Sequence, residues 1–212
     1  MSQVVNPSIE FVYFDLGNVI AFFDHELGCQ QVISLTGLPG SRIMEIIFDS
    51  GMQDEYETGK ISSQEFVDTF ASEAKIPVDG DQLLRCISNI FTVNRSMLPV
   101  ITQLAHQNFP RGILSNTCQA HWEFLCIEQV PTISELLPLH ILSFRSESMK
   151  PDQKIYRDAI ELAGVDASKI FFVDDRQENV QGARDAGIDA VLFESTQQLI
   201  SELATRGLKL NI

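Results

Sequence analysis

Residues 170–188, IFFVDDRQENVQGARDAGI, place two adjacent carboxylates, Asp174 and Asp175, directly after a run of four apolar residues. Continuous apolarity predicts a strand covered on both faces, as in a parallel sheet between layers of helices. The segment Asn179–Ala186 that follows has a helical pattern. Two neighbouring carboxylates in a partly dry crevice repel each other unless a cation lies there. The stretch therefore predicts a strand, an acidic pair at its carboxyl end, and a helix.

Four other short runs rich in Val, Ile and Phe have the same character as this strand. They are Phe11–Phe14, Gly112–Leu114, His140–Leu142 and Ala190–Phe193. Helical patterns lie between the strands, at Leu98–Gln107, Gln119–Glu128 and Asp152–Ala163. Strands that alternate with helices predict an α/β fold with a doubly wound, mostly parallel sheet and a Rossmann-like core.

One part of the chain interrupts this alternation. From about Asp24 to Phe91 we find amphipathic helical segments and no convincing strand; the segments are Gln30–Leu35, Arg42–Phe48, Gln64–Ala74 and Asp81–Ile90. An insertion directly after the first strand suggests a helical cap over the carboxyl edge of the sheet, where ligands of open α/β sheets bind. We therefore expect an α/β core of residues 1–23 and 92–212 and a helical cap of residues 24–91.

Polar residues follow three of the predicted strands, where the strands end. Asp15 follows the first strand, Ser115 and Asn116 follow the second, and the acidic pair follows the fourth; Lys150 stands before Pro151 and the start of a helix. Each residue alone has an ordinary explanation as a helix cap, a turn former or a surface lysine. Because the carboxyl ends of parallel strands share one edge of the sheet, we expect these side chains to meet there.

Taken together and in this order, the motifs resemble those of the haloacid dehalogenase-like hydrolases over nearly the whole chain. The stretches that carry the resemblance are FVYFDLGNVI, ILSNT, MKPDQKIY and FFVDDRQENVQGARDAGI. The resemblance implies that Asp15 is a nucleophile that attacks phosphate esters and forms an aspartyl phosphate. It also implies that Ser115 binds the phosphate, that Asn116 lies near the substrate, and that Lys150 neutralises both the nucleophile and the phosphate.

The resemblance implies Mg²⁺ as the cofactor, held by Asp15, the backbone carbonyl of Gly17, Asp175 and waters, with Asp174 binding directly or through water. Mg²⁺ is a hard ion that prefers oxygen ligands. Phosphoryl transfer depends mainly on positioning and on electrostatic stabilisation of negative charge, so a cation beside the nucleophile has a clear purpose.

The sequence departs from the family pattern at Gly17. Phosphatases of this kind usually have a second Asp there, which serves as general acid and base, a role worth about 10²–10⁴-fold in rate. Asp24 or His25 could replace it, although Asp24 could equally cap the first helix of the insertion. The segments FDLGNVI, YETGKIS and LSNT resemble bacterial glucose-1-phosphatase-type enzymes, which suggests a sugar phosphate as substrate.

The YETGKIS segment lies in the predicted cap, so its residues are candidates for substrate specificity. Tyr56, Glu57 and Gly59 could contact the substrate, or they could form a plain turn between two cap helices.

Composition and charge limit the partners that we expect. The 212-residue chain has 15 Lys and Arg against 29 Asp and Glu, a formal charge of −14, which repels nucleic acids and anionic lipid. No apolar run reaches the roughly 18 residues needed to span a bilayer. The four cysteines have no CxxC spacing, and the first residues do not resemble a signal peptide. We therefore expect a cytoplasmic protein with reduced thiols and a small-molecule phosphate ester as its partner.

Three other classes of protein share part of this pattern. A metal-independent 2-haloacid dehalogenase has the same fold and nucleophile, but it does not explain the tandem Asp174 and Asp175, and no arginine precedes Arg42 to bind a halide. A receiver domain is shorter and has its acidic pair ahead of the phosphorylated Asp. A catalytically weak binding or scaffold protein is supported by Gly17, and it stays open as an alternative.

Overall fold

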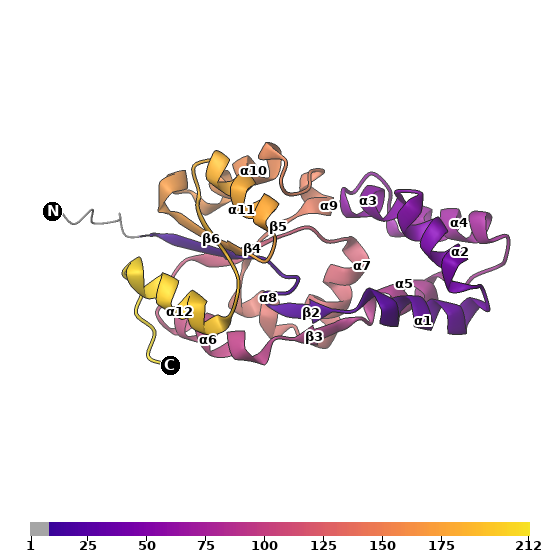
Figure 1. Ribbon diagram of the computed structural model, residues 1–212, viewed down its shortest axis with the longest axis horizontal. Helices are drawn as coiled ribbons and strands as arrows, with labels where there is room; N and C mark the ends of the chain where they lie inside the picture. The colour runs from indigo at the N-terminus through magenta and orange to yellow at the C-terminus, as the bar shows by residue number, and fades with distance from the viewer. Residues whose placement is uncertain (1–8) are drawn as a thin grey trace.

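A five-stranded parallel sheet forms the centre of the computed structural model, which describes residues 9–212 (Figure 1). The strand order is β5-β4-β1-β6-β7. The strands are β1 (Phe11–Phe14), β4 (Arg111–Ser115), β5 (Leu139–Leu142), β6 (Ile170–Asp174) and β7 (Asp189–Leu192). All five predicted strands are thus present, each within about one residue of the expected bounds, and the predicted fold class is confirmed.

Helices cover both faces of this sheet because its strands alternate their side chains between the faces. On one face Phe11 and Tyr13 pack against α10 (Gln153–Ala163) and α11 (Gln177–Asp185). On the other face Val12 and Phe14 belong to a second core with the remaining helices of this part. Those helices are α6 (Leu98–His106), α7 (Gln119–Trp122) with its continuation η3 (Glu123–Gln129), α8 (Thr132–Leu136) and α12 (Thr196–Thr205).

A third hydrophobic core holds a group of helices that lies to one side of the sheet (Figure 1). Its helices are α1 (His25–Thr36), α2 (Gly40–Met44) with η1 (Glu45–Asp49), α3 (Met52–Glu57), α4 (Ser63–Ala74) and α5 (Gly80–Ser88). Helix α4 begins at a capping box, in which the hydroxyl of Ser62 accepts from the amide of Glu65 and the Glu65 carboxylate accepts from the Ser62 amide. The expected helical insertion after the first strand is present.

Two short strands connect this helical group to the rest, and the sequence interpretation missed both. Strand β2 (Ala21–Phe23) pairs antiparallel with β3 (Phe91–Val93), so that the chain enters and leaves the helical group side by side. The five expected strands form the sheet, and the described residues contain these two more, which the sequence did not indicate. Three residues are too few for an alternating pattern to be recognised, and the pairing partners are about seventy positions apart.

The register of the sheet decides which residues meet at its carboxyl edge. Phe14 lies opposite Val173, and the amide of Asp15 donates to the carbonyl of Val173 at 2.9 Å. Phe14 also lies opposite Ile113 on the other neighbouring strand. Asp15, Asp174 and, one position further along its strand, Ser115 therefore lie at the same edge of the sheet.

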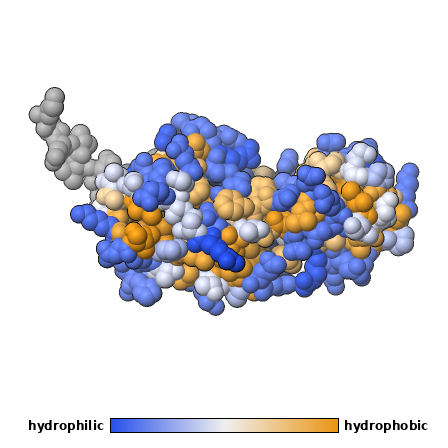
Figure 2. Space-filling model, turned by 60° about the horizontal axis from the view of Figure 1, so that its bottom comes forward, coloured by the Kyte–Doolittle hydropathy of each residue, from blue (hydrophilic) through white to orange (hydrophobic). Residues whose placement is uncertain are grey.

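The remaining short elements are η2 (Arg95–Met97), α9 (Ser143–Ser146) and η4 (Ala167–Lys169). On the face shown in Figure 2, hydrophobic patches are interspersed with hydrophilic side chains. Among residues 9–212 no helix is long and apolar enough to cross a bilayer.

Candidate active site

Asp15 stands at the carboxyl end of β1, and its carboxylate is almost buried. Oδ1 accepts from the amide of Leu16 at 2.7 Å and lies 2.9 Å from Nζ of Lys150. The Leu16 amide and the Lys150 ammonium both contact Oδ1, and neither of them contacts Oδ2. Burial raises the pKa of Asp15 to about 7, although Lys150 acts in the opposite direction. A further cation beside this carboxyl would favour its ionised, nucleophilic form.

Lys150 reaches the site from the segment before α10, with its side chain fully buried. Its Nζ donates to Asp174 Oδ2 at 2.6 Å and to the carbonyl of Leu114 at 3.0 Å, besides its contact with Asp15. An ammonium has three donors, so these partners use all of them. Burial alone would lower the pKa of Lys150, but Asp15 and Asp174 raise it above its ordinary value, so the group stays charged.

Asp174 is completely buried, and each of its oxygens has protein partners. Oδ1 accepts from the amide of Arg176 at 2.8 Å and from Nδ2 of Asn179 at 3.0 Å, while Oδ2 accepts from Asn179 at 3.1 Å in addition to Lys150. Asn179, which the sequence placed at the start of the helical segment after the acidic pair, thus fixes this carboxylate. The arrangement makes Asp174 a residue that positions Lys150.

Asp175 and Gly17 keep oxygens available for a ligand. Asp175 is partly exposed, and its Oδ2 accepts from Nδ2 of Asn18 at 2.8 Å. Within residues 9–212 no hydrogen bond ends on the carbonyl of Gly17, whereas the neighbouring carbonyl of Leu16 accepts two. Asn18 has a φ of 54°, in the left-handed region where Asn is among the tolerated residues.

The donor set fits a hard divalent cation. Asp15, Asp174 and Asp175 each place a carboxylate oxygen within 4.8 Å of the others. Oxygens bound to one Mg²⁺ at about 2.1 Å are at most about 4.2 Å apart, so only small movements would be needed. With three carboxylates and one lysine, the protein part of the site is also short of positive charge. Asp15, Asp175 and the Gly17 carbonyl are the freer ligands, because Asp174 is already engaged.

Ser115 is the last residue of β4 and Asn116 follows it, close to where the sequence placed them, and both line the cavity that contains Asp15. The Asn116 amide clamps the backbone of Lys150: Oδ1 accepts from its N–H at 2.7 Å, and Nδ2 donates to its carbonyl at 2.9 Å. One N–H of Asn116 remains for a ligand. The Ser115 hydroxyl makes a long bond, 3.3 Å to the carbonyl of Asn116, and it also interacts with the Asp15 carboxylate, which places it beside the nucleophile.

The cavity has a volume of about 250 Å³ and lies between the sheet edge and the helical group. Its sheet side includes Asp15, Ser115 and Lys150, and the residues that line the rest of it include His25 and Glu57, which the sequence named as candidates, and several that it did not name. On the side opposite the sheet edge they are mainly apolar or aromatic: Phe23, His25, Ile90, Phe91, His121 and Met149, with Asp54 and Glu57 as the acidic members. The predicted site residues are thus brought together at one edge under the helices.

Position 17 has no side chain, and an aromatic ring stands close to where one would be. A Cβ placed on Gly17 would lie 3.0 Å from Cε1 of Phe23. Asp24 is the N-cap of α1, with its carboxylate accepting from the amide of Leu27 at 3.0 Å, and it does not line the cavity. Of the two replacements that the sequence suggested for a general acid, His25 alone lines the cavity.

The YETGKIS segment divides into structural and cavity-facing residues. Tyr56 is buried, and its hydroxyl contacts Ser63 Oγ at 2.6 Å. Gly59 has a φ of +69°, and a Cβ there would lie 2.2 Å from the carbonyl oxygen of Phe144, so a glycine is required. Glu57 lines the cavity, with Oε1 accepting from Gln53 at 2.8 Å, and burial raises its pKa. Tyr56 and Gly59 therefore serve the fold, and Glu57 faces the ligand space.

The sequence interpretation missed Asn18 and the apolar side of the cavity for different reasons. Asn18 belongs to the same FDLGNVI motif as Asp15, so its position in the sequence could have indicated a place in the site, where it donates to Asp175. Phe23, Ile90 and Phe91 lie in or beside β2 and β3, and nothing in their local pattern distinguishes a cavity wall from a core.

Comparison with known families gives one match over most of the chain: the haloacid dehalogenase-like hydrolases, at residues 9–187. Two curated proteins are similar. A chloroplast flavin mononucleotide hydrolase of Arabidopsis thaliana is 24% identical over 86% of this chain and 73% of its own length. A phosphatase of Mycobacterium tuberculosis is 26% identical over 90% of each chain.

A solved structure shows the same fold. A family enzyme of Bacteroides thetaiotaomicron, crystallised with magnesium and inorganic phosphate, superposes with a TM-score of 0.79 at 24% identity, over 88% of this chain and 94% of its own. The fold, the acidic cluster and the names of these relatives agree with the expectation of a phosphatase that uses magnesium.

Proposed function

Because this chain belongs to the haloacid dehalogenase-like hydrolases and is a phosphoric monoester hydrolase of that family, we propose that it hydrolyses small phosphate monoesters through an aspartyl phosphate on Asp15. A carboxylate oxygen of Asp15 attacks the phosphorus, and the bond to the alcohol oxygen breaks. Water then attacks the phosphorus of the intermediate, which releases phosphate and restores the carboxylate.

The observation that carries this proposal is the buried contact of Lys150 with both Asp15 and Asp174, at 2.9 and 2.6 Å. It holds a fixed positive charge beside a nearly buried carboxylate at the closed end of a cavity. Such preorganised charge stabilises the negative charge of a phosphoryl group without rearrangement during the reaction. Because all three donors of Lys150 are occupied, we assign it electrostatic stabilisation of the phosphate together with orientation of Asp15.

We assign the cofactor Mg²⁺ to Asp15, the carbonyl of Gly17 and Asp175, with Asp174 as a more distant ligand. When bound, it supplies charge neutralisation between the nucleophile and the dianionic ester. Ser115 and the remaining N–H of Asn116 donate to phosphate oxygens. We further propose that residues 24–91 act as a cap on a core of residues 1–23 and 92–212, and that the protein is cytoplasmic.

Sugar phosphates are the substrate class that we favour. The resemblance of FDLGNVI, YETGKIS and LSNT to glucose-1-phosphatase-type enzymes supports them, and so does Glu57, whose carboxylate faces the cavity as an acceptor for hydroxyls. The name of the Arabidopsis relative offers a flavin phosphate as the second candidate.

The test is hydrolysis of an activated aryl phosphate with Mg²⁺, with EDTA, and after Mg²⁺ is restored. We expect activity that disappears with EDTA and returns with Mg²⁺. Asp15→Asn should lower kcat by at least about 10⁴-fold, as expected when a nucleophile is removed. Its melting temperature should stay the same or rise, because burial already favours the neutral form of this carboxyl.

A matched control is Asp185→Asn, an exposed carboxylate of α11 that bonds Gln181 and lies outside the cavity. It should keep the parental rate. Full activity in Asp15→Asn would show that the nucleophile lies elsewhere, and activity insensitive to EDTA would contradict the metal assignment. A screen of hexose phosphates and flavin mononucleotide then decides between the two substrate candidates.

A further inference from the structure

Phe23 lies next to the place where an acid at position 17 would stand. Its ring carbons Cε1 and Cδ1 would be 3.0 and 3.4 Å from a Cβ on Gly17. An aromatic ring therefore lies on the leaving-group side of the site, where phosphatases of this kind usually have the side chain of an acid. A proton for the departing oxygen then comes from water, from the substrate or from another group that lines the same cavity.

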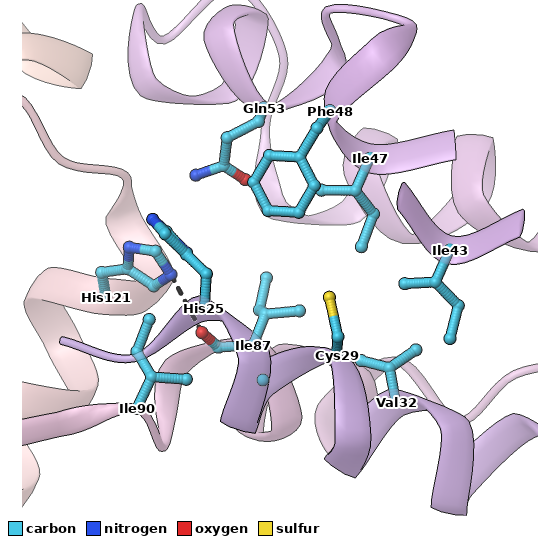
Figure 3. A pocket seen from close by; sticks show the side chains of 11 residues that line it. His25, Cys29, Val32, Ile43, Ile47, Phe48, Gln53, Ile87, Ile90 and His121 are labelled. Atoms are coloured by element: carbon cyan, nitrogen blue, oxygen red, sulfur yellow. Dashed lines mark hydrogen bonds between the residues drawn. The ribbon is translucent and has the colours of Figure 1, made fainter. Parts of the chain in front are cut away.

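The imidazole of His25 is the next group along this wall. Its ring centroid is 4.9 Å from that of Phe23, and it lines the cavity together with Asp15 and Ser115. It also lies at one end of a smaller, mostly apolar pocket in the helical group, next to His121 and away from Val32 and Ile43 (Figure 3). The two cavities share His25, His121 and Ile90, so His25 stands where the apolar pocket meets the site.

His25 has ring nitrogens that the protein does not use. In the described part of the chain neither nitrogen has a hydrogen-bond partner, while the ring is held between the aromatic rings of Phe23 and Phe48, with centroids 4.9 and 5.5 Å away. A ring that is oriented by tilted and edge contacts with two aromatic rings and has free nitrogens can exchange a proton with a ligand without losing an internal bond. Burial lowers the pKa of His25 and Asp24 acts in the opposite direction, so the imidazolium gives up its proton readily.

Three of the other titratable groups nearby are committed to partners, whereas the Asp54 carboxylate, which also lines the cavity, has no hydrogen-bond partner among residues 9–212. Nε2 of His121 lies 3.1 Å from the carbonyl of Ile87, the contact drawn in Figure 3. The Asp24 carboxylate caps α1, and Glu57 accepts from Gln53. His25 differs from all three in having its polar atoms open to the cavity.

We propose that His25 is the proton donor for the leaving-group oxygen, in place of the residue missing at position 17; this rests on the phosphatase function proposed above. As the bond between phosphorus and the ester oxygen breaks, the imidazolium of His25 transfers its proton to that oxygen, and the alcohol departs neutral. The neutral imidazole then takes a proton from the water that attacks the aspartyl phosphate, which regenerates the acid.

The test measures how the rate depends on the leaving group. Parent, His25→Asn and His25→Gln are assayed with Mg²⁺ on a series of aryl phosphates, from nitro-substituted to methoxy-substituted, and on a hexose 6-phosphate. A nitrophenolate leaves without a proton, so we expect its kcat to fall less than about 10-fold. The hexose 6-phosphate needs the proton, so its kcat should fall by about 10²–10⁴-fold. The dependence of kcat on leaving-group acidity should become steeper in both variants.

Asp24→Asn is the matched control, because Asn caps a helix about as well as Asp. It should show the parental dependence on the leaving group. If it becomes steeper while the His25 variants keep the parental slope, Asp24 is the donor and the proposal is overturned. An unchanged slope in folded His25→Asn and His25→Gln also overturns it. A parent inactive on every aryl phosphate would instead contradict the proposed phosphatase function.

Discussion

The two walls of the site cavity differ in how their polar groups are satisfied. On the sheet side, Lys150 and Asp174 form hydrogen bonds with each other and with neighbours in the same wall. On the helical side, His25 faces the cavity with free ring nitrogens among Phe23, Ile90 and Phe91. The Lys150–Asp174 pair is therefore fully hydrogen-bonded before any ligand arrives, whereas His25 is not.

This difference separates two tasks of a phosphatase. Stabilising a phosphoryl group needs charges that are fixed in advance, because reorientation during the reaction costs free energy. Binding and protonating a leaving group needs polar groups that have no hydrogen-bond partner in the protein, because only such groups can transfer a proton or donate a hydrogen bond to the alcohol. The sheet edge is built for the first task, and the helical side for the second.

The largest effect on this comparison should come from breaking the internal pairing of the sheet wall with Lys150→Met. The change leaves Asp15 and Asp174 facing each other in a buried site without their cation. Removing one partner of a buried ion pair costs about 3–5 kcal/mol. We expect a loss of that size in the free energy of urea unfolding at neutral pH, together with loss of turnover.

Lys154→Met is the control for that experiment. Lys154 contacts Asp158 at 2.9 Å with about half of its side chain exposed, the kind of surface pair that contributes about 0–1 kcal/mol. Equal losses in the two variants would mean that the Lys150 network does not hold the sheet wall together. A folded, fully active Lys150→Met protein would remove the lysine from the proposed chemistry.

Most of the sheet wall could be predicted from the sequence, because its strand-end residues are fixed by a local rule. Asp15, Ser115 and Asp174 directly follow or end buried strands, and parallel strands share a carboxyl edge. Neighbouring strands alone bring them together, without knowledge of the loops. The resemblance based on these motifs is confirmed by the family match over residues 9–187.

The helical wall could not be predicted in this way. Phe23 and Phe91 reach the cavity because β2 pairs with β3, a contact between residues far apart in sequence and only three residues long. Whether an aromatic residue faces a core or a cavity depends on what packs over it, which no local pattern records. The bonds from Asn116 to the Lys150 backbone are likewise set by tertiary structure.

An effect of intermediate size is expected for the pH dependence of stability, which His121 in the helical wall should influence. Burial lowers the pKa of His121 to about 4, from about 6.5 in an unfolded chain. The native state then favours the neutral ring, so stability is complete above pH 6.5 and falls as pH drops toward 4. At about 1.36 kcal/mol per unit, the loss is about 3 kcal/mol.

His121→Gln should therefore flatten the fall in unfolding free energy between pH 7 and pH 4, measured by urea titration at several pH values. His106→Gln, at the exposed end of α6, serves as the control and should keep the parental pH dependence. If both variants behave like the parent, the His121 ring is not held neutral by its surroundings.

The smallest effect concerns Gly17 and Phe23, where the two walls touch. The φ of Gly17 lies outside the left-handed region, so Gly17→Asp brings no backbone strain, only the 3.0 Å contact with Cε1 of Phe23. That ring is 37% exposed and can turn into the open cavity, so the cost of crowding should stay near the low end of the usual range, about 1 kcal/mol. Phe23→Leu removes the crowding ring atoms, and the double variant should recover at least half of that cost, a coupling of about 0.5 kcal/mol. Urea unfolding of the parent, the two single variants and the double variant measures this coupling.

The dependence of the rate on the leaving group measures the consequence for chemistry. An acid at position 17 should raise hexose 6-phosphate turnover more than aryl phosphate turnover, and the difference should be larger with Leu at position 23. Strictly additive free energies, with equal rate changes on both substrates, would mean that Phe23 does not keep an acid out of this place. The helical wall would then have to act on the leaving group through His25 alone.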